Sequence, residues 1–299
     1  MSHSTVSHRM RYTAQNDDDF YWERVKRNLG WLGDTEQEQR ERQTKLKDAV
    51  IGVAGCGGIG GATADRLVRM GVQNLKLADP DKFEASNINR QFGATVGNIG
   101  RNKAEAVAEL VYDTTRDVNI DVYPEGITPE SVDEFVDGCD YILDKIELYE
   151  LDARYTLHQA FRRSERCRFM MLTPVFGHRT FFFKWTKDSM TAEEYFGIPQ
   201  GAPMNRENAR QLISRFIPEM PDYPKRETLD KWFIEELTCP IFAGTPPLAQ
   251  GMLASRLGQA ITGLDQLPGS MELPVTPGYA MLDTQKWTAK TVEGKWWER

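Results

Sequence analysis

The sequence predicts an α/β fold whose mixed sheet is parallel in its first half and carries helices on both faces. The first observation is a short apolar run at 49–54, followed by a glycine-rich turn and by apolar residues at helical spacing over 59–70. The second is that strand-like and helix-like segments keep alternating, which is typical of a parallel sheet covered by helices. The further segments predicted here are strands at 75–78, 118–123 and 141–143 and helices at 103–112 and 129–136.

The second half of the chain has a different pattern. Two strand-like runs follow each other with little helix between them, so we expect the sheet to become mixed. Residues 186–238 carry many charges and several prolines and predict a long excursion from the sheet. The predicted elements of this half are strands at 169–172 and 180–185, helices at 205–216, 228–237 and 249–264, and strand-like pieces at 271–297.

The first 47 residues form a separate region by composition. Residues 1–19 are mostly polar and predict a mobile tail. Residues 20–47 are rich in charged residues and predict one or two short helices, which an aromatic stripe would pack on the main body. The stripe consists of Phe20, Tyr21, Trp22 and Trp31.

Composition argues against several classes of protein. A net charge of −7 gives no basis for nucleic-acid binding, and we interpret the basic residues at 162–168 as a solvated helix end. The sequence has no signal peptide and no long apolar run, so we expect a cytoplasmic protein without a membrane segment. No C-x-x-C pair exists, which argues against a zinc site of that type and for free thiols. The four cysteines are Cys56, Cys139, Cys167 and Cys239.

The glycine-rich turn and an acidic residue after the next strand predict a nucleotide site. Gly55, Gly57 and Gly60 fit the pattern G-x-G-x-x-G between a strand and a helix, and Gly58 adds room. Glycines let the backbone approach a phosphate, and the helix N-terminus supplies N–H donors. Asp79 lies 24 residues after Gly55 at a strand end, where its carboxylate can accept from ribose hydroxyls. These features indicate a Rossmann-like site without deciding the nucleotide.

The sequence after the second predicted strand narrows the choice of nucleotide and of protein class. It contains the motifs DPD at 79–81, SNINRQF at 86–92 and IGRNKA at 99–104. With the glycine loop at these spacings, the chain resembles the ThiF/MoeB/HesA family, the adenylating enzymes related to ubiquitin-activating enzymes. The similarity covers 48–147 well and is looser at 20–47 and 239–264. It implies that 48–299 is an adenylation domain of this type.

The resemblance also implies roles for residues of these motifs. Asp79 would hold the ribose of ATP, while Asn87, Arg90 and Lys103 would contact its phosphates. Adenylation displaces pyrophosphate, so negative charge builds on the leaving phosphates, and fixed cations and amide donors stabilise that charge best where water is excluded. The other residues that we place at the nucleotide are Asp81, Asn89 and Gln91.

A magnesium ligand is expected after a later strand, where the family has the pattern D-x-x-D-N. Here residues 144–148 read DKIEL, so Glu147 stands at the expected aspartate and Leu148 replaces the asparagine. Asp144 is the alternative ligand. Either carboxylate is a hard oxygen donor suited to Mg²⁺, and both assignments stay open.

Two further roles follow from the resemblance. Many relatives begin with a helix whose arginine reaches the ATP of a partner subunit, which suggests Arg24 or Arg27 and a homodimer. In sulfur-carrying relatives a cysteine similar to Cys239 forms a covalent link, because a thiolate can attack an acyl adenylate. A packed, inert thiol is the alternative, and it is favoured because no basic residue lies close to Cys239 in sequence.

We therefore predict an adenylyltransferase that uses Mg-ATP to activate a carboxylate as an acyl adenylate. The carboxylate would be the C-terminus of a small protein or peptide. Residues 186–238 would help to form the channel that holds it. An NAD(P)-dependent oxidoreductase is an alternative, but it gives no role to Asn87, Arg90 and Lys103. A non-catalytic nucleotide-binding partner subunit is another, suggested by the altered magnesium stretch.

Overall fold

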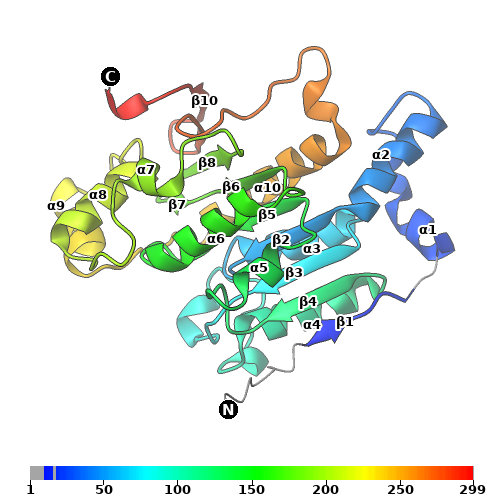
Figure 1. Cartoon of the computed structure of the whole chain (residues 1–299), viewed down its shortest axis with the longest axis horizontal. Coiled ribbons are helices and arrows are strands. Elements are labelled where there is room, and N and C mark those ends of the chain that lie inside the picture. Colours follow the sequence, from blue (N-terminus) through cyan, green and yellow to red (C-terminus); the bar gives the residue numbers. More distant parts are fainter. Residues whose placement is uncertain (1–9, 16–17, 299) are drawn as a thin grey trace.

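The protein is described here from a computed structural model, which describes residues 10–15 and 18–298. One sheet runs through the molecule in the order β1-β4-β3-β2-β5-β6-β8-β9-β10, with β7 paired to β8 (Figure 1). Its strands are β1 (Arg11–Tyr12), β2 (Val50–Ala54), β3 (Asn74–Ala78), β4 (Asn119–Tyr123), β5 (Tyr141–Asp144), β6 (Phe169–Leu172), β7 (Val175–Phe176), β8 (Arg179–Trp185), β9 (Tyr279–Asp283) and β10 (Thr288–Val292).

The sheet changes from parallel to antiparallel at β8, which confirms the predicted fold class. Strands β4, β3, β2, β5 and β6 run parallel to one another, whereas β8 is antiparallel to β6 and to β9. The parallel strands are joined through helices, but β7 and β8 are joined by a two-residue turn at Gly177, whose φ is +58°. A turn this short can join only antiparallel neighbours.

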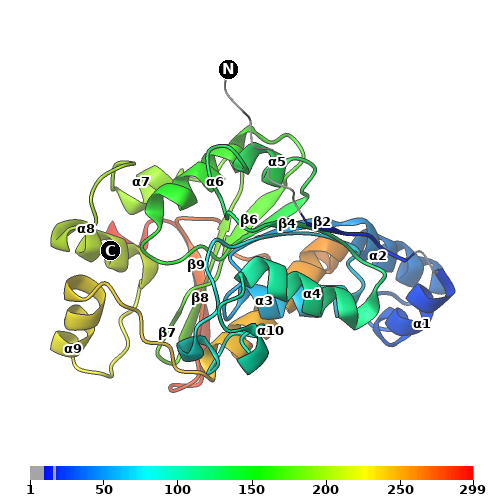
Figure 2. The ribbon, with the colours of Figure 1, turned by 90° about the horizontal axis from the view of Figure 1, so that it is seen from below.

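Helices cover both faces of the sheet. Figure 2 shows α3, α4 and α10 on one face and α5 and α6 on the other, with an apolar core between each layer and the sheet. Among the described residues, no helix is long and apolar enough to cross a membrane. The helices are α1 (Asp18–Leu29), α2 (Glu36–Asp48), α3 (Gly60–Met70), α4 (Lys103–Thr115), α5 (Val132–Val136), α6 (Leu151–Arg163), α7 (Ala192–Phe196), α8 (Arg206–Phe216), α9 (Arg226–Asp230) and α10 (Thr245–Thr262).

The N-terminal region is more ordered than the sequence predicts. Arg11–Tyr12 forms β1 at the sheet edge, antiparallel to β4, so the prediction of a mobile tail is wrong there. The rest of that predicted tail lies largely at 1–9 and 16–17, outside the described residues.

The two predicted N-terminal helices are confirmed as α1 and α2, but the aromatic stripe is only partly correct. Tyr21 is fully buried, and its hydroxyl donates to the backbone oxygen of Gly71 at 3.1 Å. Phe20 and Trp31 instead remain 46% and 88% exposed. Tyr21 therefore docks α1, together with Val25 one turn later.

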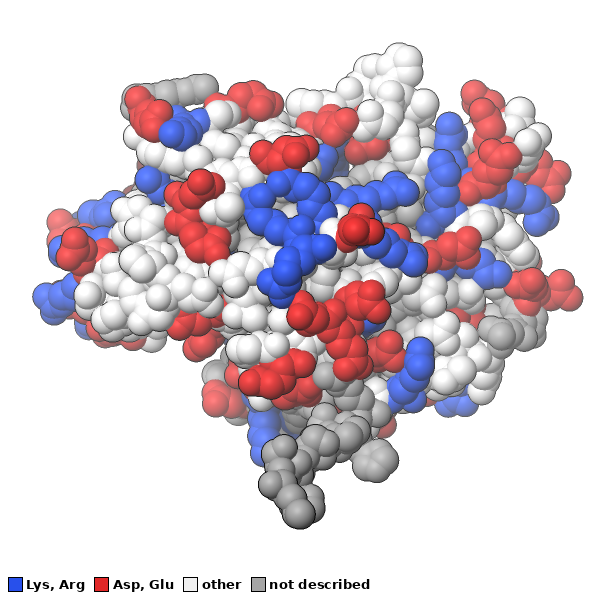
Figure 3. All heavy atoms as spheres, in the orientation of Figure 1, with Lys and Arg blue, Asp and Glu red and all other residues white. Residues whose placement is uncertain are grey.

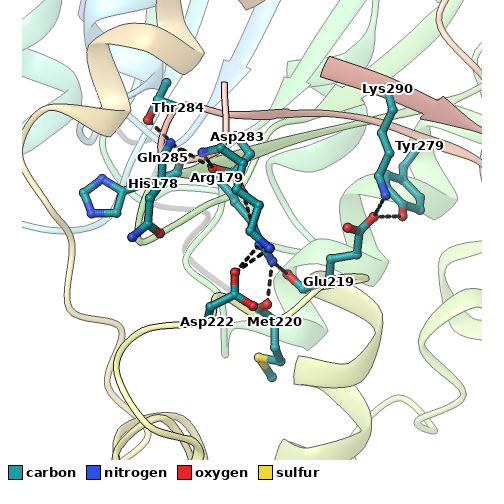
Figure 4. Close-up of polar contacts among 11 residues, drawn as sticks. His178, Arg179, Glu219, Met220, Asp222, Tyr279, Asp283, Thr284, Gln285 and Lys290 are labelled. Atoms are coloured by element: carbon teal, nitrogen blue, oxygen red, sulfur yellow. Dashed lines mark hydrogen bonds and ion pairs between the residues drawn. The ribbon is translucent and has the colours of Figure 1, made fainter. Parts of the chain in front are cut away.

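A buried arginine ties the excursion at 186–238 to the sheet (Figure 4). Arg179 on β8 pairs with Asp283 on β9 at 2.6 Å and with Asp222 of the excursion at 3.3 Å. It also donates to the backbone oxygens of Glu219 and Met220. Because the Arg179 guanidinium is buried, these partners are needed to offset its desolvation, and they fix the turn that follows α8.

The surface carries mixed charge on the face shown in Figure 3, where basic side chains gather near the middle and acidic ones border them. Within the basic run at 162–168, Arg163 pairs with Asp133 at 2.6 Å and Arg166 pairs with Asp140 at 2.9 Å. Both arginines are more than half exposed. These contacts agree with the interpretation of a solvated helix end, since exposed ion pairs contribute little to stability.

Candidate active site

A cavity of about 530 Å³ opens where the carboxyl ends of β3, β2, β5 and β6 meet. The chain leaves β2 for β3 and β4 on one side and later adds β5 and β6 on the other, so the cavity lies at the point where strand order reverses. Open α/β sheets bind ligands at this position. The cavity is lined by the glycine loop and Asp79, and also by residues 172–176, Phe216 and Cys239.

Two glycines of the loop are required by the chain itself. Gly55 has a φ of +110°, and a Cβ there would lie 2.1 Å from the backbone oxygen of Lys145. A Cβ at Gly60 would lie 1.9 Å from the backbone oxygen of Gly55. Both approaches are too close for any side chain, so the tight turn from β2 into α3 needs glycine at these two positions.

The other two predicted glycines are different. A Cβ at Gly57 or Gly58 would approach neighbouring atoms no closer than 3.7 Å and 3.4 Å, which are ordinary contacts. Both residues line the cavity. Their lack of a side chain leaves the backbone open to a ligand before α3, where N–H groups can bind a phosphate.

Asp79 is held in place by two backbone amides. Its Oδ2 accepts from the N–H of Cys56 at 2.7 Å, and its Oδ1 accepts from the N–H of Asp81 at 2.9 Å. Burial raises the pKa of Asp79, while nearby Lys103 and the two amides oppose that shift. The carboxylate is therefore fixed between the glycine loop and the DPD motif, on the cavity wall.

Basic and amide side chains of the predicted motifs also line the cavity. Lys103, the first residue of α4, pairs with Asp81 at 2.9 Å. Within the described part of the chain, Arg90 donates only to neutral oxygens, those of Asn89 and Ser86. Gln91 is buried, and its Oε1 has no hydrogen-bond partner among the described residues. This part of the wall thus offers a cation and an acceptor whose bonding capacity is not fully used.

Two of the residues predicted at the nucleotide do not line the cavity. Asn87 is buried, and its Oδ1 accepts from the N–H of Glu84 at 3.1 Å, which caps the turn before the motif. Asn89 is exposed and contacts Arg90. Both asparagines therefore make contacts within the segment that carries Arg90.

The two candidate magnesium ligands have different environments. Asp144 is fully buried, and its Oδ2 contacts Arg154 at 2.8 Å and His158 at 3.2 Å. Burial alone would raise its pKa, but these two partners lower the pKa of Asp144 well below its ordinary value. Asp144 is therefore held by Arg154 and His158 inside the fold, although it also lines the cavity.

Glu147 fits a magnesium ligand better. It is exposed on the cavity wall, and its carboxylate makes no hydrogen bond or ion pair with another described residue. The described residues contain no cluster of three or more potential metal ligands. Mg²⁺ does not need such a cluster, because it keeps several waters and binds one or two carboxylates together with substrate phosphates.

Sequence reasoning missed Lys145. Its Nζ donates to Thr173 Oγ1 at 2.7 Å and to the backbone oxygen of Met171 at 3.4 Å, and the residue lines the cavity. Burial lowers the pKa of Lys145 to about 7, and Arg154 lowers it further against the opposing effect of Asp144. The available signal was its position directly after β5, at the sheet edge where the glycine loop also lies.

Cys239 lines the same cavity as a partly exposed free thiol. Burial and then the charge of Glu147 raise the pKa of Cys239 to about 12, although Arg90 opposes them. The thiol is therefore protonated at neutral pH, and the environment does not activate it as a nucleophile.

The two candidate N-terminal arginines also differ. Arg24 pairs with Asp117 at 2.8 Å and donates to the backbone oxygen of Val68 at 2.6 Å, with its side chain 10% exposed. Arg24 is thus held by contacts within its own chain. Arg27 is exposed and makes no ion pair with another described residue.

Fold and site together define an α/β protein with a nucleotide cavity at the strand-order reversal. The sequence matches the ThiF family over residues 26–268, and the chain belongs to that family. It is 35% identical over 104 residues to the tRNA threonylcarbamoyladenosine dehydratase of Haemophilus influenzae, covering 34% of this chain and 40% of that protein. It is 38% identical over 98 residues to ubiquitin-like modifier-activating enzyme 5 of Bombyx mori, covering 33% and 24%. The chain thus spans less than half of these curated relatives.

Solved structures share the fold over most of the chain. The crystal structure of PaaA aligns with a TM-score of 0.65 and 18% identity, covering 93% of this chain and 84% of PaaA. Escherichia coli MccB, solved with ATP, aligns with a TM-score of 0.63 and 16% identity, covering 90% and 70%. These similarities agree with the mixed sheet and its helical layers.

Gly58 allows a test of whether the glycine loop leaves room for a phosphate. Gly58→Ala should change the free energy of unfolding by less than about 1 kcal/mol, because its methyl group meets only ordinary contacts. It should weaken binding of Mg-AMPCPP, a non-hydrolysable ATP analogue, by about tenfold or more, since the methyl group occupies space needed by a phosphate. Urea unfolding and calorimetric titration measure the two effects.

Gly60→Ala is the matched control, because its main effect should be on the stability of the fold. Its methyl group would overlap the backbone oxygen of Gly55, so it should destabilise the fold by about 1–3 kcal/mol or more. Wild-type affinity for Mg-AMPCPP in Gly58→Ala would contradict the placement of a phosphate at this loop.

Proposed function

We propose that the protein is a cytoplasmic ATP-dependent adenylyltransferase that activates the C-terminal carboxylate of a small protein or peptide. The observation that carries this proposal is that one cavity is lined both by nucleotide motifs and by other parts of the chain. The glycine loop, Asp79, Arg90 and Lys103 offer cations and a carboxylate to a nucleotide, and residues 172–176 and Phe216 line the same cavity. A nucleotide and an acceptor can therefore meet in one space.

The relatives support the kind of partner. One is named a ubiquitin-like modifier-activating enzyme, and MccB has been solved together with MccA. MccB has also been solved with ATP. A small protein or peptide and ATP are therefore the substrates that we propose for this chain.

The proposed reaction is attack of the acceptor carboxylate on the α-phosphate of ATP. A carboxylate oxygen forms a bond to phosphorus, the bond to the bridging oxygen breaks, and pyrophosphate leaves with the electron pair. Asp79 accepts hydrogen bonds from the ribose hydroxyls and orients the nucleotide. Arg90 and Lys103 stabilise the charge that develops on the leaving pyrophosphate, and Lys103 is already oriented by Asp81.

Magnesium would be held by Glu147 together with phosphate oxygens and water. The ion neutralises phosphate charge when it is bound. Replacement of the usual aspartate by Glu147 keeps a hard carboxylate on the wall, so the altered stretch does not by itself favour a non-catalytic subunit. An NAD(P)-dependent oxidoreductase remains less consistent with the site, because it leaves Arg90 and Lys103 without a role.

ATP–pyrophosphate exchange by the isolated chain tests the proposal. In the presence of its acceptor the wild type should exchange label, whereas Arg90→Ala and Lys103→Ala should lose about a hundred- to a thousandfold in rate, since each removes a preorganised donor. Their thermal melting should show an intact fold. Full exchange in both variants would refute the phosphate assignments, and tight NAD binding without ATP binding would refute adenylation.

Cys239→Ala belongs in the same assay. We propose that this thiol packs in the wall, because its raised pKa keeps it protonated. The variant should retain exchange and any acceptor adduct seen by intact-protein mass spectrometry. Exchange without a thiol-sensitive adduct, where the wild type forms one, would instead make Cys239 the nucleophile of a later step.

We further propose a homodimer in which Arg27 reaches the nucleotide of the partner subunit, because α1 exposes Arg27 while Arg24 is bound internally. An Arg27→Ala subunit mixed with a Lys103→Ala subunit should regain part of the exchange activity, as hybrid dimers contain one intact site. Light scattering checks the assembly. A monomer in the presence of ATP, or mixtures without any recovery, would contradict this arrangement.

A further inference from the structure

Lys145 is a basic residue of the cavity that makes no ion pair with a described carboxylate. Among the described residues, the basic side chains on the cavity wall are Arg90, Lys103 and Lys145. The ammonium of Lys145 contacts only the neutral oxygens of Thr173 and Met171. An ammonium shielded from water without an anion is costly, and an anionic ligand in the cavity would offset that cost.

The nearest carboxylate does not serve as this partner. Asp144 precedes Lys145 in the chain, but its Oδ2 faces Arg154 and His158, and its Oδ1 accepts from the N–H of Ile146 at 3.2 Å. Two of the three N–H bonds of the ammonium reach Thr173 and Met171. One N–H bond is therefore left for a ligand.

The order of the strands separates Lys145 from the other cations. Arg90 and Lys103 both belong to the segment that links β3 to α4, and Lys103 lies beside Asp81. Lys145 follows β5 and Thr173 follows β6, on the other side of the glycine loop. The cavity thus has cations on both sides of the loop at which a phosphate would bind.

In an in-line displacement, the cations on the two sides of the glycine loop would contact different groups. The attacking and leaving oxygens lie on opposite sides of the phosphorus atom. With the pyrophosphate at Arg90 and Lys103, the attacking oxygen approaches from the ends of β5 and β6. We propose that Lys145, oriented by Thr173, binds the substrate carboxylate and brings it to the α-phosphate; this inference rests on the proposed adenylyltransferase function.

Charge and backbone geometry both suit this role. The carboxylate and the phosphate are both anions, and a cation beside them offsets their repulsion. The position of Lys145 relative to the loop is fixed, because its N–H donates to the backbone oxygen of Ala54 at 2.7 Å and its own backbone oxygen packs on Gly55. Lys145 donates a hydrogen bond to the carboxylate, while the carboxylate oxygen bonds to phosphorus and pyrophosphate departs.

Two nucleotide probes test the assignment by calorimetric titration. Mg-AMPCPP reports the nucleotide end, and 5′-O-(N-acetylsulfamoyl)adenosine, a stable mimic of an acyl adenylate, also fills the acyl position. Lys145→Met should bind Mg-AMPCPP within about twofold of the wild type but lose about ten- to a hundredfold in affinity for the mimic, as expected for a hydrogen bond from a charged donor. Thr173→Val should show a smaller loss in the same direction.

Lys76→Met is the matched control, since Lys76 on β3 also donates only to neutral oxygens, those of Glu134 and Asp137, and does not line the cavity. It should bind both probes as the wild type does. Lys145→Arg keeps the charge and should recover most of the affinity for the mimic. It also provides the comparison should Lys145→Met fail to fold.

The outcomes are distinct. Equal losses for both probes would mean that Lys145 binds a phosphate of ATP, and unchanged affinity for both would exclude it from the site; either result overturns the proposal. A lower melting temperature in Lys145→Met with unchanged binding would indicate a structural role and overturn it as well. A wild-type chain that binds neither probe would overturn the adenylyltransferase function itself.

Discussion

The close approach of the Gly55 backbone to the backbone of Lys145 is the constraint on which the site depends. Gly55 adopts a left-handed φ of +110°, its N–H donates to Ala78 at 2.7 Å, and the Lys145 oxygen occupies the space of a Cβ. These contacts join the ends of β3, β2 and β5. The carboxylate of Asp79, the glycine loop and Lys145 are consequently held at fixed distances from one another, as preorganised catalysis requires.

Much of the fold, and the convergence of the predicted motifs on one cavity, could be predicted because local signals determine them. The glycine loop, Asp79 and the motif that carries Arg90 and Lys103 each combine a strand end with residues a few positions away. Parallel strands align their carboxyl ends, so separate strand-end motifs converge on one edge without knowledge of distant contacts. The change to an antiparallel sheet was also predictable from adjacent strands without an intervening helix.

The contacts that could not be predicted join residues that are far apart in sequence. Asp144 was a plausible metal ligand until Arg154 and His158 on α6 were found to occupy it. Arg24 meets Asp117, which lies 93 residues away. The hydrogen bond that orients Lys145 is accepted by Thr173, which follows the neighbouring strand β6. Ion pairs and hydrogen bonds of this kind depend on how helices and strands pack together, and no spacing rule in the sequence encodes that packing.

A crystal structure of the protein with Mg-AMPCPP would test the proposed site most directly. A ribose hydroxyl should donate to Asp79, the β- and γ-phosphates should lie at Arg90 and Lys103, and the space beside Lys145 should stay free for the acceptor. A triphosphate bound along Lys145 and Thr173, or a nucleotide outside this cavity, would contradict it.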